Sequence, residues 1–370
     1  MIINKLRIGI DAHMIGDYSG GNESFYEGIL RAFMPDKDKE YILFLKDGVD
    51  DSPYRDRFKI VRFKSKNAFI RNFVELTYLC FKYKIGVLHT QYYIPFIRPC
   101  KTVVTIHDIC FEHFNDIFKK GEYYRNKILI PYAARHADRI ITVSEFSKRD
   151  ISDTYGIDES KIRVVYNAVD SDFRILSNKR KKSSIVRAKF GIGSEPFIIC
   201  VGNLQPRKNI PRLVEAYLQY KKNNKSNLKL VIVGKKAWMY DKTLNSISQD
   251  SENIVLTGYV SRLELIELLN QAEGFIYPSF YEGFGIPPLE ALACGTKVAV
   301  SDIPVMHEIL GGYPIYFDPY DVNSISTAIA TLAENDSITV SSKKDTKIKD
   351  ITEKFSWQIS SKKIGDAYRF

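Results

Sequence analysis

Long apolar runs and paired cysteines are both missing from this sequence. No stretch approaches the roughly 18 consecutive apolar residues expected of a membrane-spanning helix. Residues 1–11 (MIINKLRIGID) lead directly into a strand-like segment instead of a signal peptide. The five cysteines form neither a CxxC pair nor a close cluster, which argues against a disulfide framework and a zinc site. We therefore expect a cytoplasmic protein in a reducing compartment.

Short repeats and low-complexity tracts are also absent, and the composition is globular. Apolar residues make up 45% of the 370 positions and charged residues 26%. This length exceeds what one hydrophobic core usually supports, so we expect two domains. The net charge of +10 favours polyanionic partners: nucleic acid, an anionic membrane surface or phosphorylated small molecules. Because no glycine-framed aromatic RNA motif and no zinc module is present, we do not expect a nucleic-acid partner.

Short apolar runs rich in β-branched residues alternate with longer amphipathic segments, the pattern of βαβ units. A polar, basic interval at 177–189 interrupts the pattern and divides it into two halves. We therefore expect an α/β protein with two doubly wound, Rossmann-like domains, residues 1–178 and 179–356, facing each other across a cleft. The predicted strands are 6–10, 41–45, 58–63, 86–90, 102–106, 139–143, 163–167, 196–202, 228–234, 253–258, 274–279, 297–301 and 314–318.

Two glutamates eight residues apart frame a glycine-rich turn in YPSFYEGFGIPPLEALACGT, residues 277–296. The turn follows a predicted strand, Gly285 lets a ligand approach the backbone, and Pro287 suits the first turn of a helix over PPLEALAC. The N–H groups of that first turn are a site for phosphate. Glu290, in the first turn, can accept from two adjacent hydroxyls, and Glu282 can accept from sugar hydroxyls. Alternatively, Glu290 only complements the helix dipole and Glu282 caps the turn.

Two adjacent cations, Arg207 and Lys208, lie in the loop GNLQPRKN that follows the predicted strand at 196–202. The arginine offers a bidentate fork and the lysine a point charge, a combination that suits a diphosphate. The alternative is a pair of solvated loop cations without a ligand.

A glycine pair, Gly20 and Gly21, follows the first strand and precedes a predicted helix. Either Asn22 or Ser19 is the expected N-cap of that helix. The pair does not complete a GxGxxG fingerprint, so by itself it is weak evidence for a phosphate loop.

His107 and Asp108 follow the strand TVVTI directly, at the carboxyl end where ligands of open α/β sheets bind. A histidine there can face a substrate. The alternative is that Asp108 caps a helix while His107 is a packed linker residue.

Taken in order, these segments resemble the retaining GT-B glycosyltransferases of family four, which include bacterial mannosyl- and glucosyltransferases of surface polysaccharide assembly. The similarity is carried by GIDAHMIGDYSGGNESFYEGIL, TIHDICF and RIITVSEFSKRDI in the first half. In the second half it is carried by GNLQPRKN, LTGYVS, the glutamate-framed segment and YFDPYD. FSWQISSKKIGDAYR resembles the terminal helix that returns to the first domain, so residues 357–370 are expected to complete that domain.

The resemblance implies a role for each motif residue. Glu290 would accept from the ribose hydroxyls of a nucleotide sugar, and Glu282 from hydroxyls of the transferred sugar. Arg207 and Lys208 would hold the diphosphate, and His107 would lie beside the anomeric carbon. Many relatives have an arginine where this chain has Asn203, so the cationic role would pass to Arg207. The remaining donor contacts would be Gly21, Tyr259, Val260, Phe284, Gly285 and Ile286.

The implied reaction is transfer of a hexose from a nucleotide-diphosphate sugar, with GDP-mannose as first expectation, to a saccharide or lipid-linked saccharide. Cations and N–H dipoles would stabilise the departing diphosphate, so neither a metal nor another cofactor is expected. The Asp170-Ser171-Asp172 triplet resembles a metal-binding pair, but it stands at the exit of the first domain. A nucleotide-sugar epimerase or hydrolase on the same scaffold is the alternative function.

Residues 64–84 (KSKNAFIRNFVELTYLCFKYK) alternate apolar and aromatic residues with cations. The pattern indicates either a basic amphipathic helix in peripheral contact with an anionic membrane or an ordinary core-facing helix of the first domain.

Overall fold

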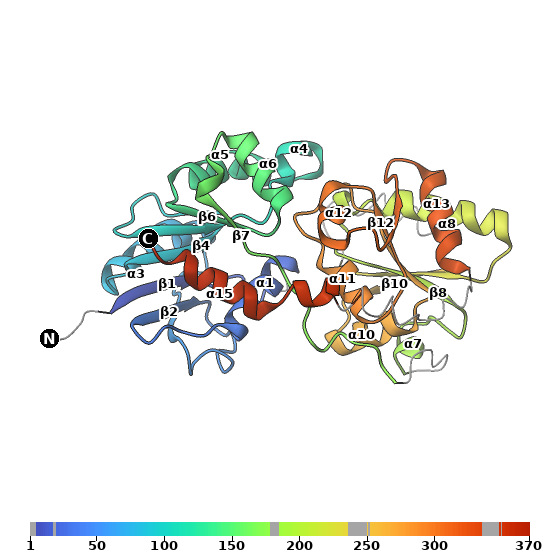
Figure 1. Ribbon diagram of the computed structural model, residues 1–370, viewed down its shortest axis with the longest axis horizontal. Helices are drawn as coiled ribbons and strands as arrows, with labels where there is room; N and C mark the ends of the chain where they lie inside the picture. The colour runs from blue at the N-terminus through green and yellow to red at the C-terminus, as the bar shows by residue number, and fades with distance from the viewer. Residues whose placement is uncertain are drawn as a thin grey trace. The chain divides into compact units, whose positions relative to one another are not determined.

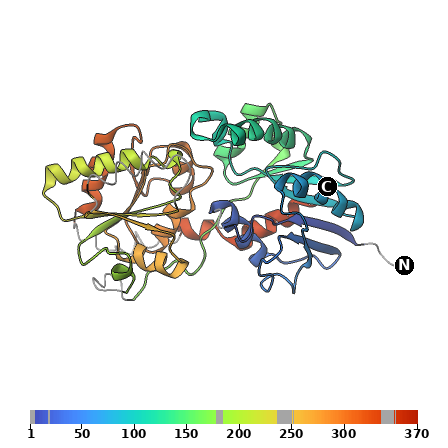
Figure 2. The same ribbon diagram turned by 180° about the vertical axis from the view of Figure 1, so that it is seen from behind.

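A computed structural model describes residues 5–17, 20–177, 185–235, 250, 252–334, 348 and 350–370. The chain forms two compact units, residues 1–168 with 355–370 and residues 169–354 (Figures 1 and 2). The expected boundary between 178 and 179 lies outside the described residues. Within the described part, no helix is both long and apolar enough to cross a membrane.

The first unit is built on a seven-stranded, all-parallel sheet in the order β3-β2-β1-β4-β5-β6-β7. Chain direction across the sheet reverses between the neighbours β1 and β4. This reversal is a topological switch point, where the carboxyl ends of open α/β sheets bind ligands. The strands are β1 (Leu6–Asp11), β2 (Lys39–Leu45), β3 (Lys59–Arg62), β4 (Val87–Gln91), β5 (Lys101–Thr105), β6 (Arg139–Thr142) and β7 (Ile162–Val164).

Helices cover both faces of this sheet. Leu88 of β4 packs with Leu76 and Leu79 of α3, whereas the adjacent His89 lines a small cavity with residues of α1 and α15. Successive strand residues point to opposite faces, so α3 lies on one face and α1 with α15 on the other. The helices are α1 (Gly21–Ala32), α2 (Ala68–Ile70), a π-helical turn (Arg71–Glu75), α3 (Leu76–Lys82), α4 (Cys110–His113), α5 (Lys120–His136), α6 (Glu145–Tyr155) and α15 (Trp357–Ala367).

The C-terminal helix α15 is an integral part of the first unit (Figure 1). A Cβ built on Gly28 of α1 would lie 2.3 Å from Cε2 of Trp357, so only glycine allows the indole to pack this closely. At the other end, the Tyr368 hydroxyl lies 2.8 Å from Nδ1 of the buried His89. These contacts attach both ends of α15 to the first unit.

The second unit contains a six-stranded parallel sheet in the order β10-β9-β8-β11-β12-β13, with its switch point between β8 and β11. Buried residues of α8 and α13 form its main core with strand residues such as Ile198 and Ile232. The strands are β8 (Phe197–Val201), β9 (Lys229–Val233), β10 (Ile254–Gly258), β11 (Gly274–Tyr277), β12 (Val298–Ser301) and β13 (Ile315–Phe317). The helices are α7 (Ile185–Lys189), α8 (Ile210–Asn224), α10 (Arg262–Gln271), α11 (Ile286–Ala293), α12 (Pro304–Leu310) and α13 (Val322–Ala333).

Each of the thirteen predicted strands overlaps one strand of the structure, and the two-sheet α/β architecture is confirmed. The strands could be predicted because they are buried on both faces and therefore form short continuous apolar runs.

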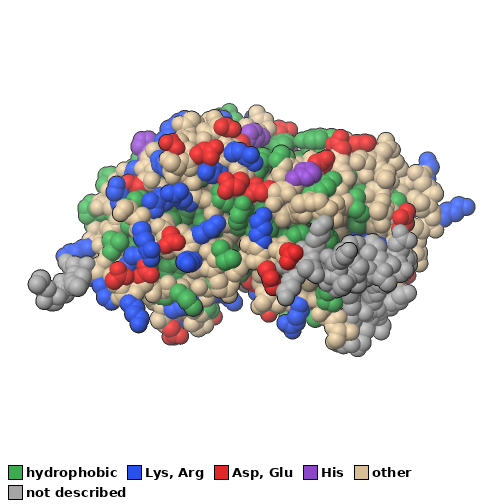
Figure 3. All heavy atoms as spheres, viewed as in Figure 1, with side chains coloured by type: hydrophobic (Ala, Val, Ile, Leu, Met, Phe, Trp, Pro, Cys, Tyr) green, Lys and Arg blue, Asp and Glu red, His purple; other side chains and the backbone are tan. Residues whose placement is uncertain are grey.

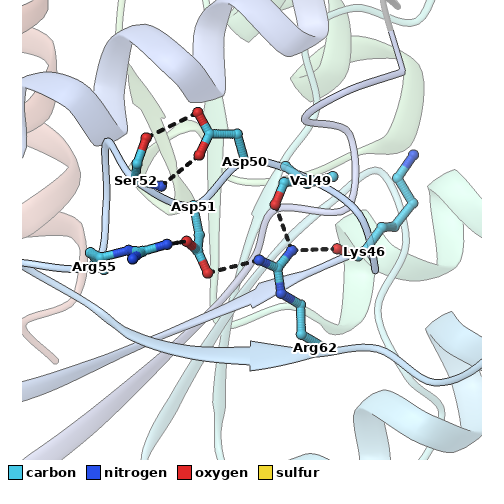
Figure 4. Close-up of polar contacts among 7 residues, drawn as sticks. All are labelled: Lys46, Val49, Asp50, Asp51, Ser52, Arg55 and Arg62. Carbon is cyan, nitrogen blue, oxygen red and sulfur yellow. Dashed lines mark hydrogen bonds and ion pairs between the residues drawn. The ribbon is translucent and has the colours of Figure 1, made fainter.

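Arg62, at the end of β3, fixes the connection between β2 and β3 (Figure 4). Its guanidinium donates to the carbonyl oxygens of Lys46 and Val49 at 2.8 Å, and to Oδ2 of Asp51 at 2.7 Å. The Lys46 ammonium also forms an ion pair with Asp17 in the loop between β1 and α1. The network therefore holds the β2–β3 connection against the loop that leads into α1.

Figure 3 shows Lys and Arg side chains interspersed with Asp and Glu side chains on the viewed face of the first unit. The net positive charge therefore does not form a single-sign stripe on this face.

Candidate functional site

The charged motif residues of the second unit meet at the switch point of its sheet. Arg207 and Lys208 belong to a 3₁₀ turn (Pro206–Lys208) after β8, and Glu282 lies in the loop after β11. The two loops are joined by a backbone hydrogen bond from the N–H of Phe280 to the carbonyl oxygen of Arg207 at 2.9 Å. Neighbouring parallel strands end at the same edge, so residues 75 positions apart in the sequence become neighbours in space.

Glu282 is held between the two cations. Its Oε2 lies 2.7 Å from Nη1 of Arg207, and its Oε1 lies 2.5 Å from Nζ of Lys208. Lys208 is 8% exposed and Glu282 is 5% exposed. The alternative of two solvated loop cations is therefore wrong for Lys208, and Glu282 forms ion pairs instead of only capping a turn. Two cations share one carboxylate, which leaves this cluster with one excess positive charge.

The pKa values follow from this geometry. Burial alone would raise the pKa of Glu282, but Arg207 and Lys208 lower it to about 2. Burial, followed by the adjacent Arg207, lowers the pKa of Lys208 to about 8, although Glu282 opposes the shift. Both groups are therefore mainly charged at neutral pH. Lys208 also donates to the hydroxyl of Tyr277 at 2.5 Å, and burial raises the pKa of that hydroxyl well above its usual value.

Glu290 has a contrasting environment. Helix α11 begins at Ile286, one residue earlier than expected, so Glu290 is its fifth residue and the prediction of a first-turn position is wrong. Burial, with a contribution from Asp170, raises the pKa of Glu290 to about 8, while Arg262 lowers it. At neutral pH the carboxyl is therefore mainly protonated and can both donate and accept hydrogen bonds.

The start of α11 presents few backbone donors. Gly285 is the N-cap, with φ 89°, and a Cβ there would lie 2.5 Å from Cε of Met306. Pro287 and Pro288 follow Ile286 in the first turn and carry no N–H, so they contribute no donor there. Among the described residues, the N–H groups of Gly285 and Ile286 have no backbone acceptor. Phe284, directly before the N-cap, is buried.

Tyr259 and Val260 directly follow β10, at another carboxyl end of the same sheet. Tyr259 is 59% exposed and its ring lies 5.0 Å from the ammonium of Lys235, while Val260 is buried. Gly258 precedes them with φ 71° and accepts from the N–H of Gly234 at 3.0 Å.

In the first unit, Gly20 is the N-cap of α1 and Gly21 its first residue, so the prediction of Asn22 as the cap is wrong, and Ser19 lies outside the described residues. A Cβ on Gly21 would meet nothing within 4 Å. Packing within the described residues therefore does not require a glycine at this position. No described side chain caps α1, but the carboxylate of Glu23 in its first turn accepts from the N–H of Gly16 at 2.7 Å. This hydrogen bond attaches the preceding loop to the helix.

His107 follows β5 and is buried. Its Nε2 lies 2.6 Å from Nε2 of Gln91, at the end of the neighbouring β4. Its ring forms a T-shaped pair with Phe25, and the ring centroids are 5.0 Å apart. Burial, followed by the nearby His89, lowers the pKa of His107 to about 3. The ring is therefore neutral at physiological pH. As placed, the amide of Gln91 donates to Nε2, which puts the ring proton on Nδ1. Asp108 does not cap α4 itself, but its carboxylate accepts from the N–H of Cys110.

Asp170 and Asp172 already have a cationic partner in the protein. Nη1 of Arg262 lies 2.5 Å from Asp170 and 3.8 Å from Asp172. Arg262, at the start of α10, therefore pairs with both carboxylates of the triplet.

Three polar residues that touch the motif residues were not singled out from the sequence. Tyr277 and Gln91 are the last residues of β11 and β4, and each therefore lies at the carboxyl end of a buried strand. That position is a signal that sequence reading could have used. Gln205 accepts from Nε of Arg207 at 3.1 Å, but its neighbourhood in the loop carries no comparable signal.

Comparison with known proteins gives concordant results for both units. A family profile described as Glycosyl transferases group 1 matches residues 183–354, and one described as Glycosyltransferase Family 4 matches residues 31–173.

Two curated proteins are similar over about two thirds of this chain. The first is O-antigen chain mannosyltransferase RfbU of Salmonella typhimurium, 34% identical over 252 residues, which are 67% of this chain and 65% of that protein. The second is O-antigen chain mannosyltransferase B of Escherichia coli, 30% identical over 264 residues, which are 69% of this chain and 67% of that protein. This chain thus spans about two thirds of the length of either relative.

Two solved structures match nearly the whole chain. A sucrose-phosphate synthase from Thermosynechococcus elongatus has a TM-score of 0.74 at 16% identity, covering 99% of this chain and 98% of that one. HepE from Anabaena, solved with UDP and glucose, has a TM-score of 0.72 at 17% identity, covering 98% and 99%. At these identities the likeness concerns the fold.

Proposed function

Because the chain belongs to glycosyltransferase family 4 and has the GT-B fold of two Rossmann-like domains, we propose that it is a retaining glycosyltransferase. It would move a hexose from a nucleotide-diphosphate sugar to a saccharide or lipid-linked saccharide. The observation that carries the proposal is the buried cluster of Arg207, Lys208 and Glu282 at the switch point of the second sheet. This is where a doubly wound domain binds a nucleotide.

The leaving group determines what the cations do. Cleavage of the sugar–phosphate bond adds negative charge to the diphosphate, and Arg207 with Lys208 stabilises that charge from a dry, fixed position. The excess positive charge of the cluster is available to the phosphates because Glu282 neutralises only one of the two cations. The N–H groups of Phe284, Gly285 and Ile286 supply further dipoles.

Retention follows from attack by the acceptor hydroxyl on the face from which the diphosphate departs. The attacking hydroxyl must lose its proton as its oxygen bonds to the anomeric carbon. His107, whose pKa is lowered to about 3 by burial, is a weak base. The departing phosphate oxygen, which gains charge as its bond to carbon breaks, is the better proton acceptor. In this proposal His107 orients the sugar through the hydrogen on Nδ1, and Gln91 fixes its ring.

The two glutamates recognise different parts of the donor. Glu282, ionised and fixed between cations, accepts from hydroxyls of the transferred sugar. Glu290, mainly protonated in the free enzyme, both donates to and accepts from the ribose diol. Tyr259 and Val260 border the base. Gly21, whose side is open, lets the backbone at the start of α1 approach the donor.

GDP-mannose is our first choice of donor, because both curated relatives reported above are named O-antigen chain mannosyltransferases. The corresponding acceptor is a growing polysaccharide or its lipid-linked precursor, used in the cytoplasm. No divalent metal is assigned to the reaction, since the protein itself supplies cations at the leaving group. A nucleotide-sugar epimerase or hydrolase is not favoured, because both relatives are named as transferases.

A thermal-shift panel of nucleotide sugars and free nucleotides tests this proposal directly. A ligand at 100 times its dissociation constant stabilises the folded state by about 2.7 kcal/mol. GDP-mannose should raise the melting temperature of the wild type and of Lys222→Ala, an exposed lysine on α8, but not of Lys208→Ala. Product analysis should then show mannose transferred to an acceptor with GDP released. Conversion of the donor without an acceptor at a comparable rate would refute the transferase assignment.

A further inference from the structure

The helical segment between β3 and β4 carries large apolar side chains on two opposite faces. Leu76, Leu79 and Cys80 pack into a core cluster with β2, β3 and β4. A helix that covers a sheet normally presents polar residues to solvent. Here the outward side is apolar at positions spaced three or four residues apart. The exposed side chains are Phe69, Ile70, Val74, Tyr78 and Phe81, each between 46% and 61% exposed. Core packing explains the apolar residues that face the sheet, but it does not explain these five exposed side chains.

Ring contacts extend this surface to the loop before β5 and to α5. The ring centroid of Phe73 lies 4.9 Å from that of Phe69, and the ring stacks on Phe96 with centroids 4.8 Å apart. Phe96 in turn contacts Tyr132 of α5 at 5.2 Å. Eighteen large apolar side chains are exposed in the described part of the chain. Five lie on this helical segment and two in the loop before β5, while Tyr124 and Ile128 lie eight and four residues before Tyr132, on the same side of α5. We define these nine as the apolar face: Phe69, Ile70, Val74, Tyr78, Phe81, Phe96, Ile97, Tyr124 and Ile128.

The loop that carries Phe96 and Ile97 is anchored, so their exposure is a property of the folded state. Thr77 Oγ1 of α3 donates to the carbonyl oxygen of Ile97 at 2.8 Å. On the other side, Nη2 of Arg98 donates to the carbonyl oxygen of His136 in α5 at 3.0 Å. The loop is thus tied to α3 and α5 at once.

Positive charge borders the apolar face. Residues 64–98 contain six Lys or Arg and one Glu, a net charge of +5. Lys64 and Lys66 precede the exposed helical stretch, Lys82 and Lys84 follow it, and all four are exposed. The one carboxylate, Glu75, already accepts from the backbone N–H groups of Lys64 and Ser65 at 2.6 and 2.9 Å.

We propose that the apolar face is a membrane-binding surface that docks on an anionic phospholipid bilayer. The aromatic and aliphatic side chains would enter the boundary between headgroups and acyl chains, while the lysines at both ends contact anionic headgroups. The face resembles an interfacial helix in having apolar residues flanked by lysines, but it is built from two helical elements and a loop.

The combination of charge and apolar surface favours an anionic bilayer over a second copy of the chain and over a nucleic acid. In a symmetric dimer each apolar face would meet its own copy, which brings the two lysine borders together and opposes association. A nucleic-acid backbone would satisfy the lysines but leave the aromatic and aliphatic side chains without a partner. An anionic bilayer satisfies both features.

Vesicle co-sedimentation of the full chain, without any sugar donor, tests the proposal independently of catalysis. We expect binding to phosphatidylcholine vesicles that contain phosphatidylglycerol, weak binding to phosphatidylcholine alone, and weakening by salt. Each lysine should contribute about fivefold to the partition coefficient at low salt. Replacing Lys64, Lys66, Lys82 and Lys84 by Gln should therefore weaken binding by more than about 100-fold.

A second variant removes apolar contacts without changing charge: Phe69→Ser, Val74→Ser and Tyr78→Ser together. It should bind at least about tenfold more weakly than the wild type. The matched control is Met34→Ser with Lys37→Gln, which alters an exposed methionine and an exposed lysine away from the apolar face and should bind like the wild type. Circular dichroism and the urea midpoint verify that each variant is folded.

Depth of insertion gives a separate measurement. A tryptophan introduced by Tyr78→Trp should be quenched by brominated acyl chains, whereas one introduced by Met34→Trp should not. Failure of the wild type to bind anionic vesicles would overturn the proposal. So would equal binding by the triple serine variant, or concentration-dependent dimerisation of the wild type that this variant abolishes.

Discussion

The ammonium of Lys208 lies 2.5 Å from Oε1 of Glu282, with both side chains buried where β8 and β11 end. Arg207 approaches the other carboxylate oxygen at 2.7 Å. Removing one member of a buried ion pair leaves a charge without compensation, which typically costs about 3–5 kcal/mol. The cluster is therefore both a structural element of the second unit and the proposed counter-charge for the diphosphate, and substitutions must be assessed for both effects.

Replacing Glu282 should reduce turnover more than donor affinity. Glu282 is assigned to the transferred sugar, whose charge changes during the reaction, whereas Glu290 is assigned to the ribose, whose charge does not. We expect Glu282→Ala to lower kcat and Glu290→Ala to raise KM. Steady-state kinetics with variants of verified fold provide the measurement, and equal effects of both substitutions on both constants would contradict this division.

The two glutamates should change stability with pH in opposite senses. The pKa of Glu282, lowered to about 2, lies below the value near 4.3 of an unfolded chain, so its ionised form stabilises the fold above about pH 4.3. That stability is lost as the pH falls toward 2. The pKa of Glu290 is raised to about 8, so the folded state binds this proton more tightly than the unfolded chain does. The fold therefore loses stability as the pH rises from about 4.3 to 8.

Urea midpoints between pH 3 and pH 9 measure this contrast. Glu282→Gln should be less stable than the wild type above about pH 4.3, and the difference should shrink as the pH falls toward 3. Glu290→Gln should gain stability relative to the wild type as the pH rises toward 8. Glu215→Gln, an exposed carboxylate on α8, is the control for loss of one negative charge. A Glu290→Gln curve parallel to that of the wild type would show that Glu290 ionises normally.

Donor cleavage should continue in excess EDTA. Arg207 and Lys208 supply two positive charges, and Asp170 already pairs with Arg262. Lys208→Ala should lower turnover by on the order of 100- to 1000-fold, and neither magnesium nor manganese should restore it. Lys222→Ala serves as the matched control. Inhibition by EDTA that is reversed by added metal would mean that the two cations are not sufficient.

Gly28→Ala should destabilise the first unit. The added methyl would lie 2.3 Å from Trp357, and overpacking of this kind costs about 1–3 kcal/mol. Gly121→Ala, where a Cβ meets nothing within 4 Å, should be neutral or slightly stabilising. The double variant Gly28→Ala with Trp357→Leu should recover part of the loss in urea unfolding. A Gly28→Ala protein as stable as the wild type would show that α15 does not pack on α1 in this way.

The sequence by itself determined the strands, their grouping into two α/β halves and the identity of the motif residues. Fully buried parallel strands form continuous apolar runs, and ligands of such sheets bind after the strands, so residues such as Lys208 and Glu282 could be selected from position alone. Helix starts were less accessible: the N-cap at Gly20 and the start of α11 at Ile286 depend on backbone geometry, not on a capping side chain.

Only the tertiary structure decided how these residues are paired and charged. Local pattern cannot show that Lys208 and Glu282, 74 positions apart, form a buried ion pair, because that contact depends on which strands are neighbours in the sheet. Nor can it show that Glu282 and Glu290 have pKa values on opposite sides of the ordinary range. Those values depend on burial and on nearby charges such as Asp170, which come together only in the folded chain.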